Sequence, residues 1–356
     1  MTLPADSDRP VVMVTGAFPP DICGVGDYTG RLMASAPSSW QLLVERNWTL
    51  GAAIGILRRL LQRRPSIIIV QYPTQGYGWS LIPHLLVVFG KVTGWYRSVL
   101  ALHEFTSLSG KARAVLAIAS HFAAHIVFTT EVERDRARAD WLFSSRVPTS
   151  IIGILSNIPW TISPPPFSDR DIDVAYFGHI RPNKGLENFL EVMAGVRRAN
   201  GSTRIAVIGE IPKGFEAFGE MVAARCREID CALILNLDDE AAGRRLADIK
   251  ILYLPFRDGV SARRGSALAG LGNGALVASL IGDATPKSLL PAVVPCDGSE
   301  GDVQVLLRTL RYSNAEAAVL QRAGHTYIET MLPRDWAHVV AMYESVLAAA
   351  SAKGGR

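Results

Sequence analysis

Short apolar runs without polar alternation recur along this chain, and they constrain its fold more than any other feature. Each run has about the length of a strand, and segments with a helical pattern separate most of them. A strand that is apolar on both faces belongs in a parallel sheet, because helices cover both sides of such a sheet. The sequence therefore predicts an α/β fold. The runs are VVMVTGA, SIIIVQY, SVLALHEF, HIVFTTE and TSIIGILSN, then DVAYFGHI, RIAVIGE, CALILNL, IKILYLPF, ALVAS and AVVPC.

A proline-rich segment separates the two sets of runs. Residues 156–171, SNIPWTISPPPFSDRD, indicate a connector, because proline cannot donate a backbone hydrogen bond within a helix or an inner strand. A chain of 356 residues has the usual length of two packed domains. We expect an N-terminal Rossmann-like domain over residues 1–163 and a C-terminal one over residues 170–334. The helix at 335–350 is expected to pack back on the N-terminal domain.

Composition and charge exclude several classes of protein. Hydrophobic residues make up 49% of the chain and charged residues 20%, which is typical of a globular protein and excludes a disordered one. The net charge of +4 is too small to indicate nucleic acid as a partner. The four cysteines form no CxxC pair, which argues against a zinc site or a disulfide framework. Since we find neither a secretory signal nor an apolar run of transmembrane length, we expect a cytoplasmic protein.

Glycine and basic residues gather in the loops that follow the expected strands. Two doubly wound domains facing a central cleft would bind a ligand at these loops, beyond the carboxyl ends of the strands. FPPDICGVGDY follows the first strand, and FGHIRPNKG and LPFRDGVSARRGS follow two strands of the second half. Backbone amides at a helix start, with Lys or Arg nearby, bind phosphate oxygens. These loops therefore predict a site for a phosphate and a sugar.

Lys184 stands directly before a helix that we expect to begin near Leu186. The amino end of a helix disfavours a cation unless an anion lies between the two. A bound diphosphate would remove this conflict. Without the other motifs, a solvated surface lysine is the more common explanation for such a residue, and the glycine loop alone is also compatible with a plain turn from strand to helix.

The ordered set of motifs resembles the retaining GT-B glycosyltransferases of the broad group-one, mannosyltransferase-like type, which use a nucleotide-diphosphate sugar. The resemblance covers most of the chain, from the glycine loop through QYP, LHEF and SNIP to FGHIRPNKG and LPFRDGVSARRGS. It implies transfer of a sugar, with retention of configuration, to a glycan or lipid-linked acceptor in cell-surface polysaccharide or glycolipid assembly. It implies no cofactor and no bound metal, and the adjacent Asp238 and Asp239 lack the spacing of a metal-holding pair.

The resemblance also implies roles for residues of the first half. Gly24, Val25 and Gly26 would lie against the donor diphosphate and the transferred sugar, where a side chain would collide. His103 would lie beside the transferred sugar as a catalytic residue, and Glu104 would orient an acceptor hydroxyl. The alternative for His103 is a buried histidine at a strand end, satisfied by a backbone carbonyl. In similar enzymes the leaving phosphate accepts the proton, so no general base is assigned.

In the second half, the resemblance implies a catalytic Lys184 that grips the diphosphate and a catalytic Asp258 that contacts the donor sugar. Two positions depart from the common pattern. His179 stands where similar enzymes carry an arginine, so we expect Arg181 to reach the phosphates, and Ser266 replaces a glutamate that contacts the ribose. Both His179 and Ser266 are still expected to contact substrate. The remaining expected contacts are Gly259, Val260, Ser261, Arg263, Arg264 and Gly265.

A basic segment predicts where a lipid-linked acceptor is met. GILRRLLQRRPS places Arg58, Arg59, Arg63 and Arg64 beside leucines, and the apolar WSLIPHLLVVFGKVTGWYR follows. Such a surface would rest on an anionic leaflet at the inner face of the cell membrane. The alternative is an ordinary solvated helix face followed by a packed helix.

Two other functions remain open from the sequence. Another GT-B reaction, such as that of a nucleotide-sugar epimerase or a phosphorylase, would use the same donor site. A non-catalytic nucleotide-sugar-binding assembly partner would also explain the departures at His179 and Ser266.

Overall fold

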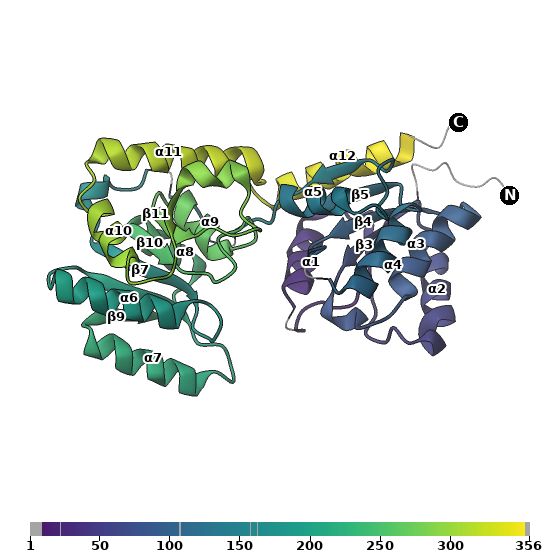
Figure 1. Cartoon of the computed structure of the whole chain (residues 1–356). Helices are drawn as coiled ribbons and strands as arrows, with labels where there is room; N and C mark the ends of the chain where they lie inside the picture. Colours follow the sequence, from purple (N-terminus) through teal and green to yellow (C-terminus); the bar gives the residue numbers. More distant parts are fainter. Residues whose placement is uncertain (1–8, 22, 107, 157, 162, 353–356) are drawn as a thin grey trace. The chain divides into compact units, whose positions relative to one another are not determined.

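The structure is a computed structural model that describes residues 9–21, 23–106, 108–156, 158–161 and 163–352 (Figure 1). The polar start of the chain, on which the expectation of no secretory signal rested, lies outside the described residues as far as residue 8. Contacts divide the chain into two units. Unit 1 is Met1–Gly153 with Pro333–Arg356, and unit 2 is Ile154–Leu332. Each unit contains one parallel sheet of six strands.

In unit 1 the strand order is β2-β1-β3-β4-β5-β6, with every neighbouring pair parallel. Alternate side chains of β1 enter two different cores: Val12 and Val14 pack with α2 to α5, whereas Met13 packs with α1 and α12. Helices therefore cover both faces, as continuous apolar strands require. The strands are β1 Val11–Thr15, β2 Trp40–Val44, β3 Ile67–Tyr72, β4 Arg97–Leu102, β5 His125–Phe128 and β6 Thr149–Ile151. The helices are α1 Gly24–Ser35, α2 Ala53–Gln62, α3 Ile82–Thr93, α4 Gly110–Ser120, α5 Glu131–Ala139 and α12 Trp336–Ala352.

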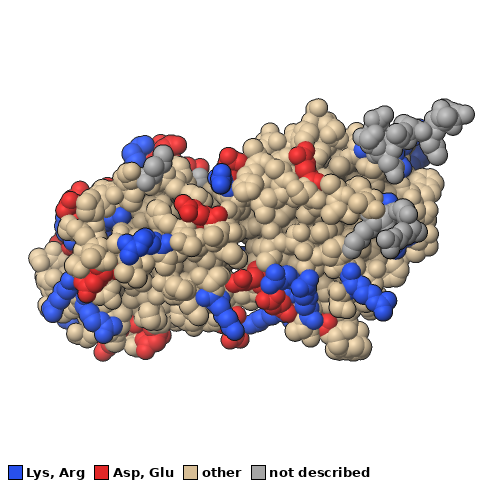
Figure 2. Space-filling model, turned by 90° about the horizontal axis from the view of Figure 1, so that it is seen from above, with Lys and Arg blue, Asp and Glu red and all other residues tan. Residues whose placement is uncertain are grey.

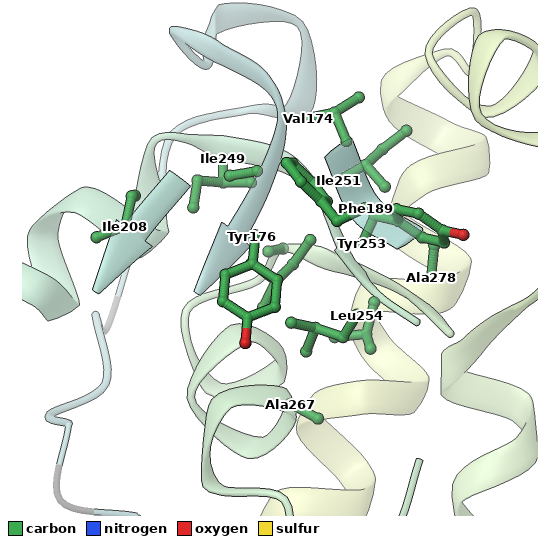
Figure 3. Close-up of a cluster of buried hydrophobic side chains, with 14 of the residues drawn as sticks. Val174, Tyr176, Phe189, Ile208, Ile249, Ile251, Tyr253, Leu254, Ala267 and Ala278 are labelled. Carbon is green, nitrogen blue, oxygen red and sulfur yellow. The ribbon is translucent and has the colours of Figure 1, made fainter. Parts of the chain in front are cut away.

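In unit 2 the strand order is β12-β11-β10-β7-β8-β9, again with parallel neighbours. Its core gathers around the aromatic rings of Tyr176, Phe189 and Tyr253, which Figure 3 shows among aliphatic side chains of the central strands. The strands are β7 Ile172–His179, β8 Ile205–Glu210, β9 Cys231–Leu235, β10 Ile249–Leu254, β11 Leu276–Leu280 and β12 Val293–Cys296. The helices are α6 Leu186–Ala199, α7 Glu216–Glu228, α8 Asp239–Ala247, α9 Gly265–Gly272, α10 Asp302–Thr309 and α11 Asn314–Met331.

Two edge strands differ from the sequence expectation. In β2 only Trp40 and Leu43 are buried, and Gln41 interrupts the apolar residues, so WQLLV was not among the predicted strands. The run TSIIGILSN is a strand only at Thr149–Ile151, where it forms the opposite edge of the same sheet. An edge strand pairs on one side and is partly exposed, so the pattern of a buried parallel strand does not describe it.

The boundary between the units also differs from the expected limits. Residues from Ile154 onward belong to unit 2, whereas the sequence placed residues up to 163 in the N-terminal domain. Asn273, at the end of α9, explains the difference. Its Oδ1 accepts hydrogen bonds from the backbone N and Oγ1 of Thr161 at 2.9 and 2.8 Å, and its Nδ2 donates to the Pro159 carbonyl at 3.2 Å. The connector is therefore bound to unit 2. At the other end, unit 2 stops at Leu332.

No helix within the described residues is long and apolar enough to cross a membrane. The four cysteines are free thiols. On the face shown in Figure 2, Lys and Arg side chains intermingle with Asp and Glu, so the small positive excess forms no extended patch there.

Replacing Asn273 by Leu should lower the free energy of unfolding by about 2 to 4 kcal/mol, because the connector groups bonded to it lose their buried partner. Asn314 is the matched control: it also bonds to a distant segment, at Ser168, but it is exposed. Asn314→Leu should cost less than about 1 kcal/mol. Urea unfolding of both variants measures the difference, and equal costs would contradict the role given to Asn273.

Candidate functional site

A pocket of ≈ 410 Å³ opens at the carboxyl ends of the central strands of unit 2. β7 lies between β8 and β10, so the strand order reverses at β7. Open α/β sheets leave a crevice at such a reversal, because the connections on its two sides go to opposite faces of the sheet. The pocket is lined by the ends of β7 and β8, by the loop before α9, and by residues of α8 and of the connector.

The loop FGHIRPNKG leaves β7 at His179 and enters α6 at Leu186. Gly185 caps the helix with a positive φ of 80°, and a Cβ at this position would collide with the carbonyl oxygen of Pro255. Only glycine satisfies both the backbone conformation and the space. The predicted helix start near Leu186 is therefore observed, with Lys184 immediately outside it.

Tyr176 contacts the backbone of this loop through its hydroxyl group. Its ring is buried in the core (Figure 3). Its hydroxyl oxygen lies 3.4 Å from the carbonyl oxygens of both His179 and Lys184. Burial raises the pKa of the phenol, so Tyr176 stays a neutral hydrogen-bond donor. The tyrosine thus links the core of unit 2 to the backbone of Lys184.

Positive charge is concentrated beside the pocket. Burial lowers the pKa of Lys184, and the neighbouring Arg181 and Arg264 lower it further, while Asp258 acts in the opposite direction. Arg264 forms an ion pair with Asp258, and its guanidinium lies 4.5 Å from the centre of the Phe256 ring. Three cations and one carboxylate therefore share a small region, an arrangement that a bound anion would stabilise.

The start of α9 adds backbone donors to the same wall. Gly265 and Ser266 form its first turn and line the pocket. The first N–H groups of a helix have no acceptor within the helix, and its dipole favours a negative charge. The pocket thus combines side-chain cations with a helix start, which is the chemistry of a phosphate site.

The structure sorts the expected residues of unit 2 into three groups. Arg181 and Asp258 do not line the pocket, but both lie close enough to Lys184 to shift its pKa. His179, Lys184, Arg263, Arg264, Gly265 and Ser266 line the pocket. Val260 and Ser261 are instead buried, and the backbone N of Val260 donates to the Leu280 carbonyl at 2.9 Å. Gly259 has a φ of 82°, and a Cβ there would collide with Gly282. These three residues shape the loop from inside and do not line the pocket.

His103 is only 4% exposed and follows β4 in unit 1. Its Nε2 lies 2.7 Å from Oε1 of Gln71, and its ring meets Tyr28 edge-on at 5.1 Å between centres. The backbone carbonyl suggested by the sequence is therefore not the partner at Nε2; a side-chain amide takes that place. Glu104, the next residue, is exposed.

The glycine motif of unit 1 is a helix start rather than an open loop. Gly24, Val25 and Gly26 form the first turn of α1. A Cβ at Gly26 would lie 3.1 Å from the Ala17 carbonyl oxygen, so close packing accounts for this glycine. At Gly24 no described atom lies within 4 Å of an added Cβ, so packing does not account for it. Ile22, in the same motif, is outside the described residues.

Sequence reasoning missed several residues of the pocket wall. Glu210 ends β8 directly beside β7, a position that the strand pattern alone could have indicated. Asp239 also lines the pocket, whereas Asp238 caps α8 and accepts a hydrogen bond from the Ala241 backbone N at 2.7 Å. The described residues contain no group of three or more His, Cys, Asp or Glu side chains arranged for a metal ion. The other wall residues that were missed are Ser156, Ile158, Tyr176, Phe177, Gly178, Ile208, Gly209, Leu237, Ala242 and Phe256.

By sequence, no protein-family model and no curated protein matches the chain. Solved structures match it by fold. Anabaena HepE in complex with UDP and glucose has a TM-score of 0.64 at 10% identity, covering 96% of this chain and 99% of its own. A glycosyltransferase from Rickettsia africae has a TM-score of 0.68 at 10% identity, with coverages of 98% and 100%. An E. coli trehalose-6-phosphate structure bound with UDP-2-fluoro glucose has 0.61 at 13% identity, with coverages of 95% and 98%.

The chain has the GT-B fold, with two Rossmann-like domains. The expectation of an α/β protein with two Rossmann-like domains is confirmed. Identities near a tenth establish the fold alone, so the reaction is argued from the pocket of unit 2.

The pKa of Lys184 should rise when Arg264 is replaced by Gln. The substitution removes a nearby cation and releases Asp258, and both changes favour the protonated amine. An NMR titration of ¹³C-methylated lysines, with Lys184→Arg to assign the signal, compares the two proteins. An unchanged or lower pKa in Arg264→Gln would contradict the charge cluster.

Proposed function

We propose that the protein is a glycosyltransferase that takes its sugar from a nucleotide-diphosphate donor bound in the unit 2 pocket. The carrying observation is that Lys184, Arg264 and the start of α9 line a pocket at the strand-order reversal, with Arg181 near Lys184. A diphosphate supplies the negative charge that this group lacks. The GT-B fold, found here by comparison, supports a sugar nucleotide as the source of that diphosphate.

The wall of the pocket fits the rest of such a donor. Ile158, Leu237 and Ala242 provide an apolar side for a nucleobase, and the carboxylates of Glu210 and Asp239 can accept hydrogen bonds from ribose hydroxyls. They would thus supply the carboxylate contact to the ribose that is lost where Ser266 replaces a glutamate. HepE binds UDP and the E. coli structure binds UDP-2-fluoro glucose, so uridine is the base we propose.

In the reaction, the bond between the sugar and the diphosphate breaks and negative charge grows on the leaving phosphate. A cation held there in advance stabilises the transition state more than the bound donor. Lys184 has this role, with Arg264 and Arg181 beside it, and no bound metal is part of the proposal. We propose retention of configuration, with the leaving phosphate oxygen accepting the proton of the acceptor hydroxyl.

The acceptor side of the proposal rests on unit 1. His103 and the first turn of α1, Gly24 to Gly26, are assigned to the transferred sugar, and Glu104 to the acceptor hydroxyl. The acceptor is a glycan or a lipid-linked sugar, in assembly of a cell-surface polysaccharide or glycolipid. These assignments follow the motif resemblance and are tested by substitution at each position.

A non-catalytic sugar-nucleotide binder is the second candidate, favoured by the exposed His179 in place of an arginine. Donor hydrolysis without acceptor separates the two candidates. A transferase releases free sugar and nucleoside diphosphate slowly, whereas a binder releases none. An epimerase would instead return an isomeric sugar, so product analysis by NMR distinguishes all three.

Thermal shift against UDP-, GDP-, ADP- and dTDP-sugars should show the largest stabilisation with a UDP-sugar. A donor at 100 times its Kd stabilises the folded state by about 2.7 kcal/mol. UDP alone should give most of the shift if the diphosphate carries the binding energy. A protein that none of the four classes stabilises would contradict the donor site.

Replacing Lys184 by Ala should lower kcat/KM by roughly two to three orders of magnitude, or about 3 to 4 kcal/mol of transition-state stabilisation. The apo protein should be no less stable, because a lysine with a lowered pKa is unfavourable in the folded state when no anion is bound. Arg264→Ala should act in the same direction but less, since Arg263 also lines the pocket.

Lys213→Ala is the matched control, because Lys213 is an exposed lysine of the same unit outside the pocket wall. It should retain wild-type kinetics. Steady-state kinetics and melting curves of the three variants decide the matter. Near wild-type turnover in Lys184→Ala would show that this lysine is only a surface residue.

A further inference from the structure

One face of unit 1 is apolar, exposed and poor in acidic residues. Residues 46–103 contain no Asp or Glu, although the whole chain contains 33. This stretch includes α2 and α3, which lie side by side on one face of the sheet (Figure 1). We call the outward surface of these two helices the α2–α3 face. The lysines and arginines of the stretch are Arg46, Arg58, Arg59, Arg63, Arg64, Lys91 and Arg97.

Large apolar side chains of this face are turned to solvent. Ile54 on α2 is 82% exposed, and Leu85 and Val92 on α3 are 52% and 71% exposed. Lys91 is the single Lys, Arg, Asp or Glu of α3, whose opposite side is already buried in the core. A helix that is apolar all round normally lies buried. The outward side of α3 is therefore an apolar surface that no other part of the described chain covers.

Between the helices lies a groove of ≈ 390 Å³, lined almost wholly by apolar atoms of Ile54, Leu57, Leu85, Phe89 and Val92. A second hollow of ≈ 660 Å³ shares Ile54 and Leu57 with it and continues to Arg58, Arg64 and Trp95. The apolar groove and the cationic hollow thus form one surface, which exceeds a scatter of single exposed side chains.

Tryptophans stand at both ends of α3. Trp79 precedes the helix and is 84% exposed, and Trp95 follows it and is 54% exposed. Arg9 fixes the second position, because its guanidinium donates to the carbonyl oxygens of Pro65 and Trp95 at 2.7 and 2.8 Å. Tryptophan, with an apolar ring and a polar N–H, is the residue enriched where hydrocarbon meets water.

The cations of the face differ from the four-arginine surface expected from the sequence. Arg59 is paired with Glu45, and Arg63 donates to the Arg59 carbonyl, so these two are engaged locally. Arg58 and Arg64 are exposed in the hollow, and Lys91 is exposed on α3. Arg58 and Arg64 line the hollow that continues from the apolar groove, and Lys91 precedes Val92 on α3. The apolar side chains, and not an arginine row, therefore form the centre of the surface.

We propose that the α2–α3 face docks on an anionic phospholipid bilayer. Ile54, Val92 and Trp95 enter the boundary between headgroups and acyl chains, while Arg58 and Lys91 meet anionic headgroups. A second copy of the chain fits this face poorly. A two-fold interface pairs a surface with itself, and here that would oppose like charges, because the only acid that the described contacts bring to α2 is Glu45, already paired with Arg59. Docking needs no donor, so it stands apart from the proposed function.

Co-sedimentation of the full chain with vesicles tests the proposal. Vesicles of phosphatidylcholine alone, and of equimolar phosphatidylcholine and phosphatidylglycerol, separate apolar from electrostatic binding. Binding should be stronger to the anionic vesicles and should weaken as salt is added. Arg58→Gln with Lys91→Gln should lower the partition coefficient on anionic vesicles by roughly 30-fold, which is about fivefold for each cation removed. The double substitution should leave binding to phosphatidylcholine vesicles unchanged.

Ile54→Ser, Val92→Ser and Trp95→Ser combined should lower binding to both kinds of vesicle by at least roughly 10-fold. All three side chains are more than half exposed, so the melting temperature should change little. Trp141→Ser with Val319→Ser removes exposed apolar groups elsewhere, and Arg227→Gln with Arg322→Gln removes exposed charges from unit 2. Both controls should bind as the wild type does.

Equal binding by the wild type and the triple serine variant would overturn the proposal, as would a wild type that binds neither kind of vesicle. Sedimentation velocity tests the alternative, in which a second copy of the chain binds this face. Self-association that the triple variant abolishes, without any vesicle binding, would assign the face to a second copy of the chain.

Discussion

The reversal of strand order at β7 determines where unit 2 can bind a ligand. α6 follows β7 and packs with α7 and α10, whereas α9 follows β10 and packs with α8 and α11. The loops that begin α6 and α9 therefore leave the sheet toward opposite faces, and the space between them stays open. Lys184 enters this space from one loop and Arg264 from the other. The topology thus brings together two cations 80 positions apart in the sequence.

This convergence of like charges has a physical consequence for the empty protein. A lysine whose pKa is lowered in the folded state binds its proton less well there than in the unfolded chain, so its charge opposes folding at neutral pH. The opposition fades only as the pH rises through the lowered pKa toward the ordinary value of the lysine. A diphosphate reverses the sign of the local field, so the same cluster that is unfavourable when empty favours the bound state.

The sequence predicted those parts of the structure that local chemistry determines. Continuous apolar runs located ten strands within a few residues, and the Gly-Leu junction located the start of α6 at Leu186. Long-range packing determined the rest. The partner of His103 is Gln71, from a neighbouring strand, and Val260 turns inward because Leu280 accepts its backbone hydrogen bond. Asp239 reaches the pocket through the placement of α8, which no local motif encodes, whereas the strand pattern indicates the end of β8 that carries Glu210.

The Asp258–Arg264 ion pair is the contact that a bound diphosphate would replace. The Asp258 side chain is 68% exposed, and an ion pair so open to water contributes only about 0 to 1 kcal/mol. Arg264 is 21% exposed and rests on the Phe256 ring, so its position does not depend on the carboxylate. A diphosphate carries more charge than Asp258 and can therefore replace it at Arg264 with little loss. In the proposed function, the released Asp258 accepts a hydrogen bond from a hydroxyl of the donor sugar. In the function proposed here, the same event that binds the phosphates makes the sugar-binding carboxylate available.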